Sequence, residues 1–187
     1  MLNFSALPPE VNAVKLRTGP GNTSMLAAGK AWEQLSDALD EALVDIDSVG
    51  RTLTGVWQGA VAMKMTQAVA AYCAWLWRIS EHAGVIARET HRVAWLYWAA
   101  HMGMVPPSVI AETITQRETL IRNNLLGQNT GAIATAEAKY QQYWRVNADE
   151  MNSYARDAWA AMSLMTPFAE APEITNETVL AQADIES

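Results

Sequence analysis

The feature that most constrains the fold is an uninterrupted helical pattern that runs from Trp57 to about Met102. Apolar or small side chains recur along this stretch, and with His82 and Glu89 they alternate in steps of three and four residues, which is the spacing of one face of an α-helix. No proline interrupts the pattern. At about 1.5 Å rise per residue, such a helix would be roughly 65–70 Å long. A helix of this length predicts a rod-like molecule.

The same helix carries a second row of apolar residues, so that most of its circumference is apolar at the middle and at the far end. A helix that packs against a single neighbour needs only one apolar stripe. We therefore expect this helix to be covered from more than one side, either by the rest of the chain or by a second protein. The second row consists of Val69, Leu76, Ala83 and Tyr97, and it is widened by Trp77, Trp95 and Trp98.

The rest of the chain also has helical periodicity, and the predicted fold class is all-α, an elongated antiparallel bundle. The first long helix has a seven-residue repeat of apolar positions, which is typical of coiled-coil-like packing. Its opposite face is acidic, which is most simply a solvated surface. We expect an irregular arm over residues 1–21, with a short helical turn from Pro9, helices over about 22–53, 57–102, 107–125 and 131–165, and an acidic, mobile tail over 169–187.

The charge of the chain disfavours nucleic acid and anionic membranes as partners. The 187 residues carry a formal net charge of −7, and the basic residues are scattered. Binding to nucleic acid needs a positive patch that replaces counterions. No basic segment followed by an apolar run opens the chain, so we expect no Sec-type signal peptide.

No arrangement of residues points to catalysis, a cofactor or a metal. A di-iron site in a helical bundle needs repeated Glu-x-x-His pairs, but Glu81 is followed three residues later by Gly84, and Glu89 by Arg92. The lone Cys73 is expected to be a small buried hydrophobe rather than a reactive thiol. We therefore expect a protein that is not an enzyme and that binds no cofactor or metal.

Two adjacent leucines, Leu125 and Leu126, occupy the turn between the third and fourth long helices. Asparagine and glutamine flank them, Gly127 suits a helix C-cap, and Asn129 or Thr130 suits an N-cap. An apolar pair at a hairpin tip cannot easily reach the core, which predicts exposed apolar surface. The alternative is that both leucines fold back as the hydrophobic contact of a glycine C-cap.

Several short motifs together resemble the conserved domain of mycobacterial PPE proteins over residues 1–168. They are, in chain order, Pro8-Pro9-Glu10, Gly19-Pro20-Gly21, Ser24-Met25-Leu26-Ala27-Ala28 leading to Ala31-Trp32, Trp57-Gln58-Gly59, Asn124-Leu125-Leu126-Gly127-Gln128-Asn129, and Thr166-Pro167-Phe168. The fifth motif has leucines where many family members have phenylalanines. Longer relatives continue well beyond this domain, whereas this sequence ends about 20 residues after it.

The resemblance implies a non-enzymatic substrate of a type VII (ESX) secretion system. Family members pair 1:1 with a PE protein, a helical hairpin, and the two proteins form a four-helix bundle. An EspG chaperone binds the pair in the cytosol, and the pair is then secreted or reaches the cell surface. Two other functions stay open: a self-associating structural bundle, and a protein that acts on membranes after export.

The resemblance also implies the residues that carry these contacts. The chaperone would dock at the hairpin tip, Asn124, Leu125, Leu126, Gly127, Gln128 and Asn129, and the turn with Trp57 and Gly59 would lie beside the export signal of the PE protein. The first two long helices and the arm would hold PE. The expected PE interface comprises Leu7, Pro8, Pro9, Met25, Trp32, Leu35, Leu39, Ile46, Leu53, Val61, Met65, Tyr72 and Leu76.

Overall fold

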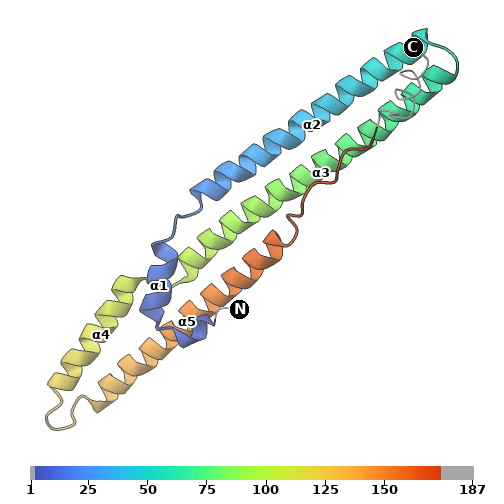
Figure 1. The fold of residues 1–187 in the computed structure, drawn as a ribbon. Helices are drawn as coiled ribbons and strands as arrows, with labels where there is room; N and C mark the ends of the chain where they lie inside the picture. The colour runs from blue at the N-terminus through green and yellow to red at the C-terminus, as the bar shows by residue number, and fades with distance from the viewer. Residues whose placement is uncertain (1–2, 174–187) are drawn as a thin grey trace, which may run out of the picture. The chain divides into compact units, whose positions relative to one another are not determined.

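The structure is a computed structural model that describes residues 3–173, and every regular element in this range is helical. A 3₁₀ turn, η1 (Phe4–Ala6), precedes five α-helices (Figure 1). These are α1 (Pro9–Arg17), α2 (Thr23–Val56), α3 (Ala60–Gly103), α4 (Pro107–Arg122) and α5 (Thr130–Met162). The all-α class predicted from the periodicity is confirmed. The acidic tail expected over 169–187 lies outside the described residues from position 174 onward.

An irregular arm with a short helical turn from Pro9 was expected over residues 1–21. In the structure this turn is the nine-residue helix α1. Proline at the first helical position has the backbone angle of a helix and needs no hydrogen bond from its nitrogen there. Glu10 in the first turn and Lys15 and Arg17 in the last turn are also favourable to the helix dipole. The Pro8-Pro9 pair therefore starts a helix.

Helices α4 and α5 each end three residues before the predicted bounds of 125 and 165. The residue after α4 is Asn123, which keeps a negative φ of −95°. Gly127 was expected to be a helix C-cap, but it lies four residues further along, in the loop. Its φ of +81° is a backbone conformation that glycine adopts without steric cost.

The described chain divides into two compact units. The core unit, residues 3–27 and 89–163, contains η1, α1, α4, α5 and the C-terminal part of α3. The hairpin unit, residues 28–88 and 164–173, contains most of α2, the N-terminal part of α3 and the segment that follows α5. Each unit is described separately below.

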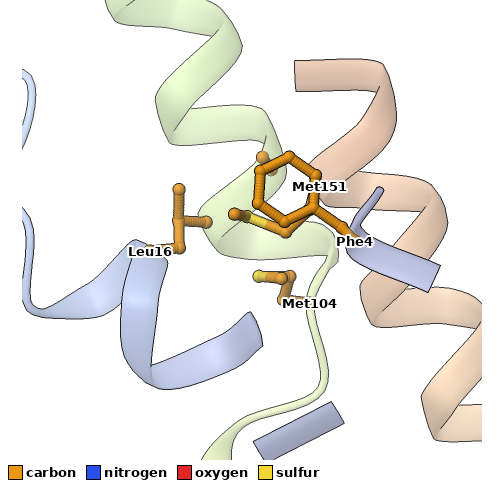
Figure 2. Packing of buried hydrophobic residues seen from close by; sticks show 5 residues of the cluster. Phe4, Leu16, Met104 and Met151 are labelled. Atoms are coloured by element: carbon orange, nitrogen blue, oxygen red, sulfur yellow. The ribbon is translucent and has the colours of Figure 1, made fainter. Parts of the chain in front are cut away.

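The core unit is held by an apolar cluster to which four parts of the chain contribute. Phe4 of η1, Leu16 of α1, Ala100 of α3 and Met151 of α5 pack together with Met104, which directly follows α3 (Figure 2). Their exposed fractions are at most 9%. Because η1 and α1 supply two of these five side chains, the N-terminal residues are part of the core rather than a loose extension.

One buried amide ties three parts of the core unit together. The Asn147 side chain is fully buried on α5. Its Nδ2 donates to the carbonyl oxygens of Pro9, at 2.9 Å, and Val105, at 3.2 Å, and its Oδ1 accepts from the Val105 backbone nitrogen at 2.8 Å. These bonds connect the start of α1 to the link between α3 and α4, and they satisfy both backbone groups of Val105, which lies outside any helix.

The α1 helix also contacts α3 directly. The Arg17 guanidinium donates through Nη1 to the His101 ring Nε2, at 2.9 Å, and through Nη2 to the His101 carbonyl, at 3.2 Å. The Tyr97 hydroxyl donates to the Leu16 carbonyl at 3.1 Å. These bonds satisfy carbonyl groups close to the ends of both helices, where fewer partners within the helix are available.

In the hairpin unit, α2 and α3 approach each other closely at small residues. A Cβ built on Gly50 would lie 2.8 Å from Val69 Cγ1, so the contact needs glycine at this position. Further along, Ser36 Oγ donates to the Ser80 carbonyl at 3.0 Å, and Ser80 Oγ donates to the Ser36 carbonyl at 3.2 Å. The turn between the two helices contains Gly59, whose φ is +93°.

Candidate protein interfaces

The described residues expose several apolar surfaces. Between residues 3 and 173, no group of three or more His, Cys, Asp or Glu side chains could hold a metal ion. No helix in the same range is long and apolar enough to cross a membrane. Many large apolar side chains are exposed instead, and three places stand out: the loop after α4, the turn after α2, and the open side of the hairpin unit.

The loop between α4 and α5, residues 123–129, presents two leucines to solvent. The exposed fraction is 88% for Leu125 and 93% for Leu126, the highest values among the exposed large hydrophobic residues of the described chain. The alternative in which both leucines fold back onto the helix end does not describe this structure. We call residues 123–129 the tip loop.

Polar side chains of the tip loop hold its backbone in place. Asn129 Nδ2 donates to the carbonyls of Leu120, at 3.2 Å, and Asn123, at 3.1 Å, and Gln128 Nε2 also donates to the Asn123 carbonyl. Two of the carbonyl groups near the end of α4 thus find partners outside the helix. Asn129 precedes α5, but its side chain makes no cap bond to that helix.

Two further bonds close the tip loop around the leucines. The Leu126 backbone nitrogen donates to Gln128 Oε1 at 2.9 Å, and the Asn129 backbone nitrogen donates to Asn124 Oδ1 at 2.7 Å. Because Asn124, Gln128 and Asn129 use their polar atoms inside the loop, their role is to position Leu125 and Leu126. An apolar pair on a rigid loop loses little conformational freedom on binding.

The turn between α2 and α3 exposes an indole ring. Trp57 is 50% exposed, and both of its apolar neighbours Val56 and Val61 are more exposed, at 76% and 69%. A tryptophan that plugs the end of a bundle would be buried, so Trp57 does not act as such a plug in this structure. Gly59 permits the sharp backbone reversal that places Trp57 at the turn.

The open side of the hairpin unit is an apolar groove beside the close approach of Gly50 and Val69. Its apolar lining includes Ile46, Val49, Leu53 and Val69, and its volume is about 230 Å³. Val49 is 59% exposed and Leu53 is 37% exposed. A two-helix hairpin cannot enclose an apolar stripe on its own, so this groove is uncovered apolar surface.

The thirteen residues expected to contact PE fall into three groups. Pro9 and Leu76 are buried within the chain. Met25, Leu35, Leu53 and Val61 are exposed. The others, which are Leu7, Pro8, Trp32, Leu39, Ile46, Met65 and Tyr72, are half-buried.

Two contacts of the Trp32 region were not predicted from the sequence. The Phe168 ring lies 5.9 Å from the Trp32 ring and 5.0 Å from the His82 ring, measured between centroids. Phe168 follows α5 in the chain, where no helical period gives a register. The positions of Trp32 and His82 in their stripes gave no sign of this contact, because other large or polar residues, such as Tyr72 and Glu89, stand in the α3 stripe as well.

Comparison with known proteins identifies the family. The PPE family model matches residues 3–166. The chain is similar to two Mycobacterium tuberculosis proteins, the uncharacterized PPE19, at 41% identity, and PPE18, at 40%. Both alignments cover 94% of this chain but 45% of the relative, so the chain spans less than half the length of these relatives. Similarity to PPE41 of the same organism is 33% over 96% of this chain and 92% of that protein. The chain therefore belongs to the PPE family.

Proposed function

We propose that this chain is a non-enzymatic secretion substrate that forms a 1:1 helical heterodimer with a PE protein. The observation that carries the proposal is the uncovered apolar groove of the hairpin unit, which Ile46, Val49, Leu53 and Val69 line. Two further helices packed against α2 and α3 would complete a four-helix bundle. A PE hairpin supplies two antiparallel helices of this kind.

The pattern of side chains on α2 supports a helical partner rather than an extended peptide. The apolar positions of α2 recur every seven residues at Trp32, Leu39, Ile46 and Leu53. Such a repeat suits the knobs-into-holes packing of helices that lie nearly parallel or antiparallel. An obligate interface of this kind buries on the order of 2,000 Å² or more.

We expect the double substitution Val49→Asp and Leu53→Asp to abolish pairing with PE. Both side chains line the groove and are exposed, so charges there are tolerated by the free chain but not in an apolar interface. The measurement is co-expression of tagged PE proteins with the chain, followed by affinity capture and sizing. The unsubstituted chain should elute as a 1:1 complex and should be poorly soluble alone.

Val44→Asp is the matched control, because Val44 is on the same helix and is 63% exposed, but lies among the acidic residues Asp40, Glu41 and Asp45. It should leave pairing intact. A monodisperse chain that unfolds cooperatively without PE would contradict the proposal, and a stable homodimer would favour the self-associating alternative.

The tip loop is the proposed docking site of an EspG chaperone in the cytosol, and export through a type VII (ESX) system follows. The support is the rigid presentation of Leu125 and Leu126, which are almost fully exposed. An apolar pair on an ordered loop is suited to fill pockets of a partner protein. The resemblance of the tip-loop motif, Asn124 to Asn129, to that of the family is a second support for this docking site.

We expect Trp57→Ala to leave stability nearly unchanged and to block export of the assembled pair. The ring is 50% exposed, so its removal should cost about 1 kcal/mol or less, far below the 3–5 kcal/mol of a buried aromatic residue. Thermal melting of the purified PE complex tests the first part. Immunoblotting of culture filtrate from a mycobacterial host tests the second, with Val44→Asp as the control. Normal export of the Trp57→Ala complex would refute a role in the signal.

A further inference from the structure

The segment that follows α5 packs on both helices of the hairpin unit. We call residues 164–169 the strap. The Phe168 ring of the strap lies against Trp32 of α2 and His82 of α3. Two strap carbonyls accept hydrogen bonds from α3: Ala169 from Trp75 Nε1, at 3.0 Å, and Thr166 from His82 Nε2, at 2.8 Å.

The strap lies on the same apolar stripes that the proposed partner needs. On α2, Trp32 belongs to the seven-residue repeat that continues through Leu39 and Ile46. On α3, Trp75 and His82 continue the stripe that begins at Val61 and Met65. The strap contact at Trp32 thus shares its row on α2 with Ile46 and Leu53 of the groove, whereas the groove residue of α3, Val69, is on the second row of that helix.

The strap has the properties of a replaceable occupant. Phe168 is its one aromatic side chain, it contacts Trp32 and His82, and 39% of that residue stays exposed. Both hydrogen bonds use main-chain carbonyls of the strap, which water can replace. A helical hairpin that buries on the order of 2,000 Å² would outcompete so small a contact.

We infer that the groove for the PE partner extends along α2 as far as Trp32, so that the strap and the partner compete for it and the strap shields the apolar surface around Trp32 and Trp75 until the partner displaces it. This inference rests on the proposed pairing with PE. A partner that must displace the strap binds with an apparent affinity reduced by the fraction of chains in which the groove is free. Loosening the strap should therefore strengthen binding.

The test uses the full chain with Phe168→Asp, which removes the ring contact and leaves α2, α3 and the core unit unchanged. Each variant is kept in solution without its partner as a fusion to a solubility tag, and a fluorescent PE hairpin, from the PE protein that co-purifies with the chain, is titrated into it. We expect Phe168→Asp to bind more tightly, by roughly tenfold if the strap occupies the groove nine-tenths of the time. Glu170→Ala is the matched control, because Glu170 is an exposed residue just beyond the strap. The affinity of this variant for the PE hairpin should equal that of the unsubstituted chain.

Equal or weaker binding of Phe168→Asp would overturn the shared groove while leaving the proposed pairing in place. Failure of every PE protein to bind either form would overturn the proposed function and, with it, the competition. A second readout is chymotrypsin cleavage after Phe168 in the unsubstituted PE complex. Displacement predicts faster cleavage there than in the free chain, and protection of Phe168 in the complex would overturn the inference.

Discussion

Replacing Asn147 by leucine should be among the most destabilising single substitutions in this chain. Leucine has nearly the same size and retains helix propensity, but it removes three hydrogen bonds to Pro9 and Val105 in a fully buried place. Each buried backbone group left without a partner costs about 1–3 kcal/mol. We therefore expect a loss of roughly 3–6 kcal/mol from a total stability of about 5–15 kcal/mol.

Thermal melting of the PE complex, followed by circular dichroism, is the measurement for Asn147→Leu. A loss of this size should lower the midpoint by roughly 10 °C or more in a chain of this length. The matched control is Asn152→Ala, five residues along the same helix. The Asn152 side chain makes one exposed hydrogen bond, of 3.2 Å to the Ser5 hydroxyl, and its removal should cost about 0.5 kcal/mol. An unchanged midpoint for Asn147→Leu would show that the three buried bonds have no net effect.

The all-α class and the long helices followed from the sequence because they depend on spacing alone. A stripe that alternates steps of three and four over more than forty residues has no reasonable fold other than a helix. Helix ends were less accurate because they depend on capping. Helix α4 ends three residues early because side chains from the loop bind its last carbonyl groups. Gln128 donates to the carbonyl of Asn123, the residue after the helix, and Asn129 donates to that of Leu120.

The contacts that close the core unit could not be read from periodicity. Asn147 stands beside Ala148, and a pattern of apolar positions cannot show which neighbouring polar residue turns inward. A buried amide is recognised only when its backbone partners are known, and those of Asn147 are 138 and 42 positions away. The contact of the strap could not be predicted for the same reason, because Phe168 packs against Trp32, which is far away in the sequence.

Some properties of the candidate interface residues could be predicted from the sequence, and others could not. Exposure of Leu125 and Leu126 was predictable, because no turn of that length can return both side chains to the core. The burial of Pro9 and Leu76 was not, because a stripe does not say whether its own chain or a partner covers it. The sequence did not show that polar residues of the tip loop hydrogen-bond within the loop and to the end of α4, because such bonds depend on the backbone conformation of the loop.

Replacing Leu125 and Leu126 together by glutamate should abolish chaperone binding and leave both folding and PE pairing unchanged. Both side chains are almost fully exposed, so charges there cost the free chain little. In a complex, each desolvated leucine contributes about 1.5–3 kcal/mol. Loss of both should weaken binding by a hundredfold or more.

The measurement is titration of a purified EspG chaperone into the PE complex, together with the melting temperature of the complex. Gln128→Ala separates presentation from contact: it keeps both leucines but removes the bonds to Leu126 and Asn123 that order the loop. Because a loosened loop must be ordered again on binding, we expect a smaller loss, of about tenfold or less. Ile121→Glu is the matched control, since Ile121 is 50% exposed on α4 but outside the tip loop. If the double glutamate variant binds the chaperone with unchanged affinity, the tip loop is not the docking site. If Gln128→Ala loses as much affinity as the double variant, the loop acts through its polar atoms rather than through its leucines.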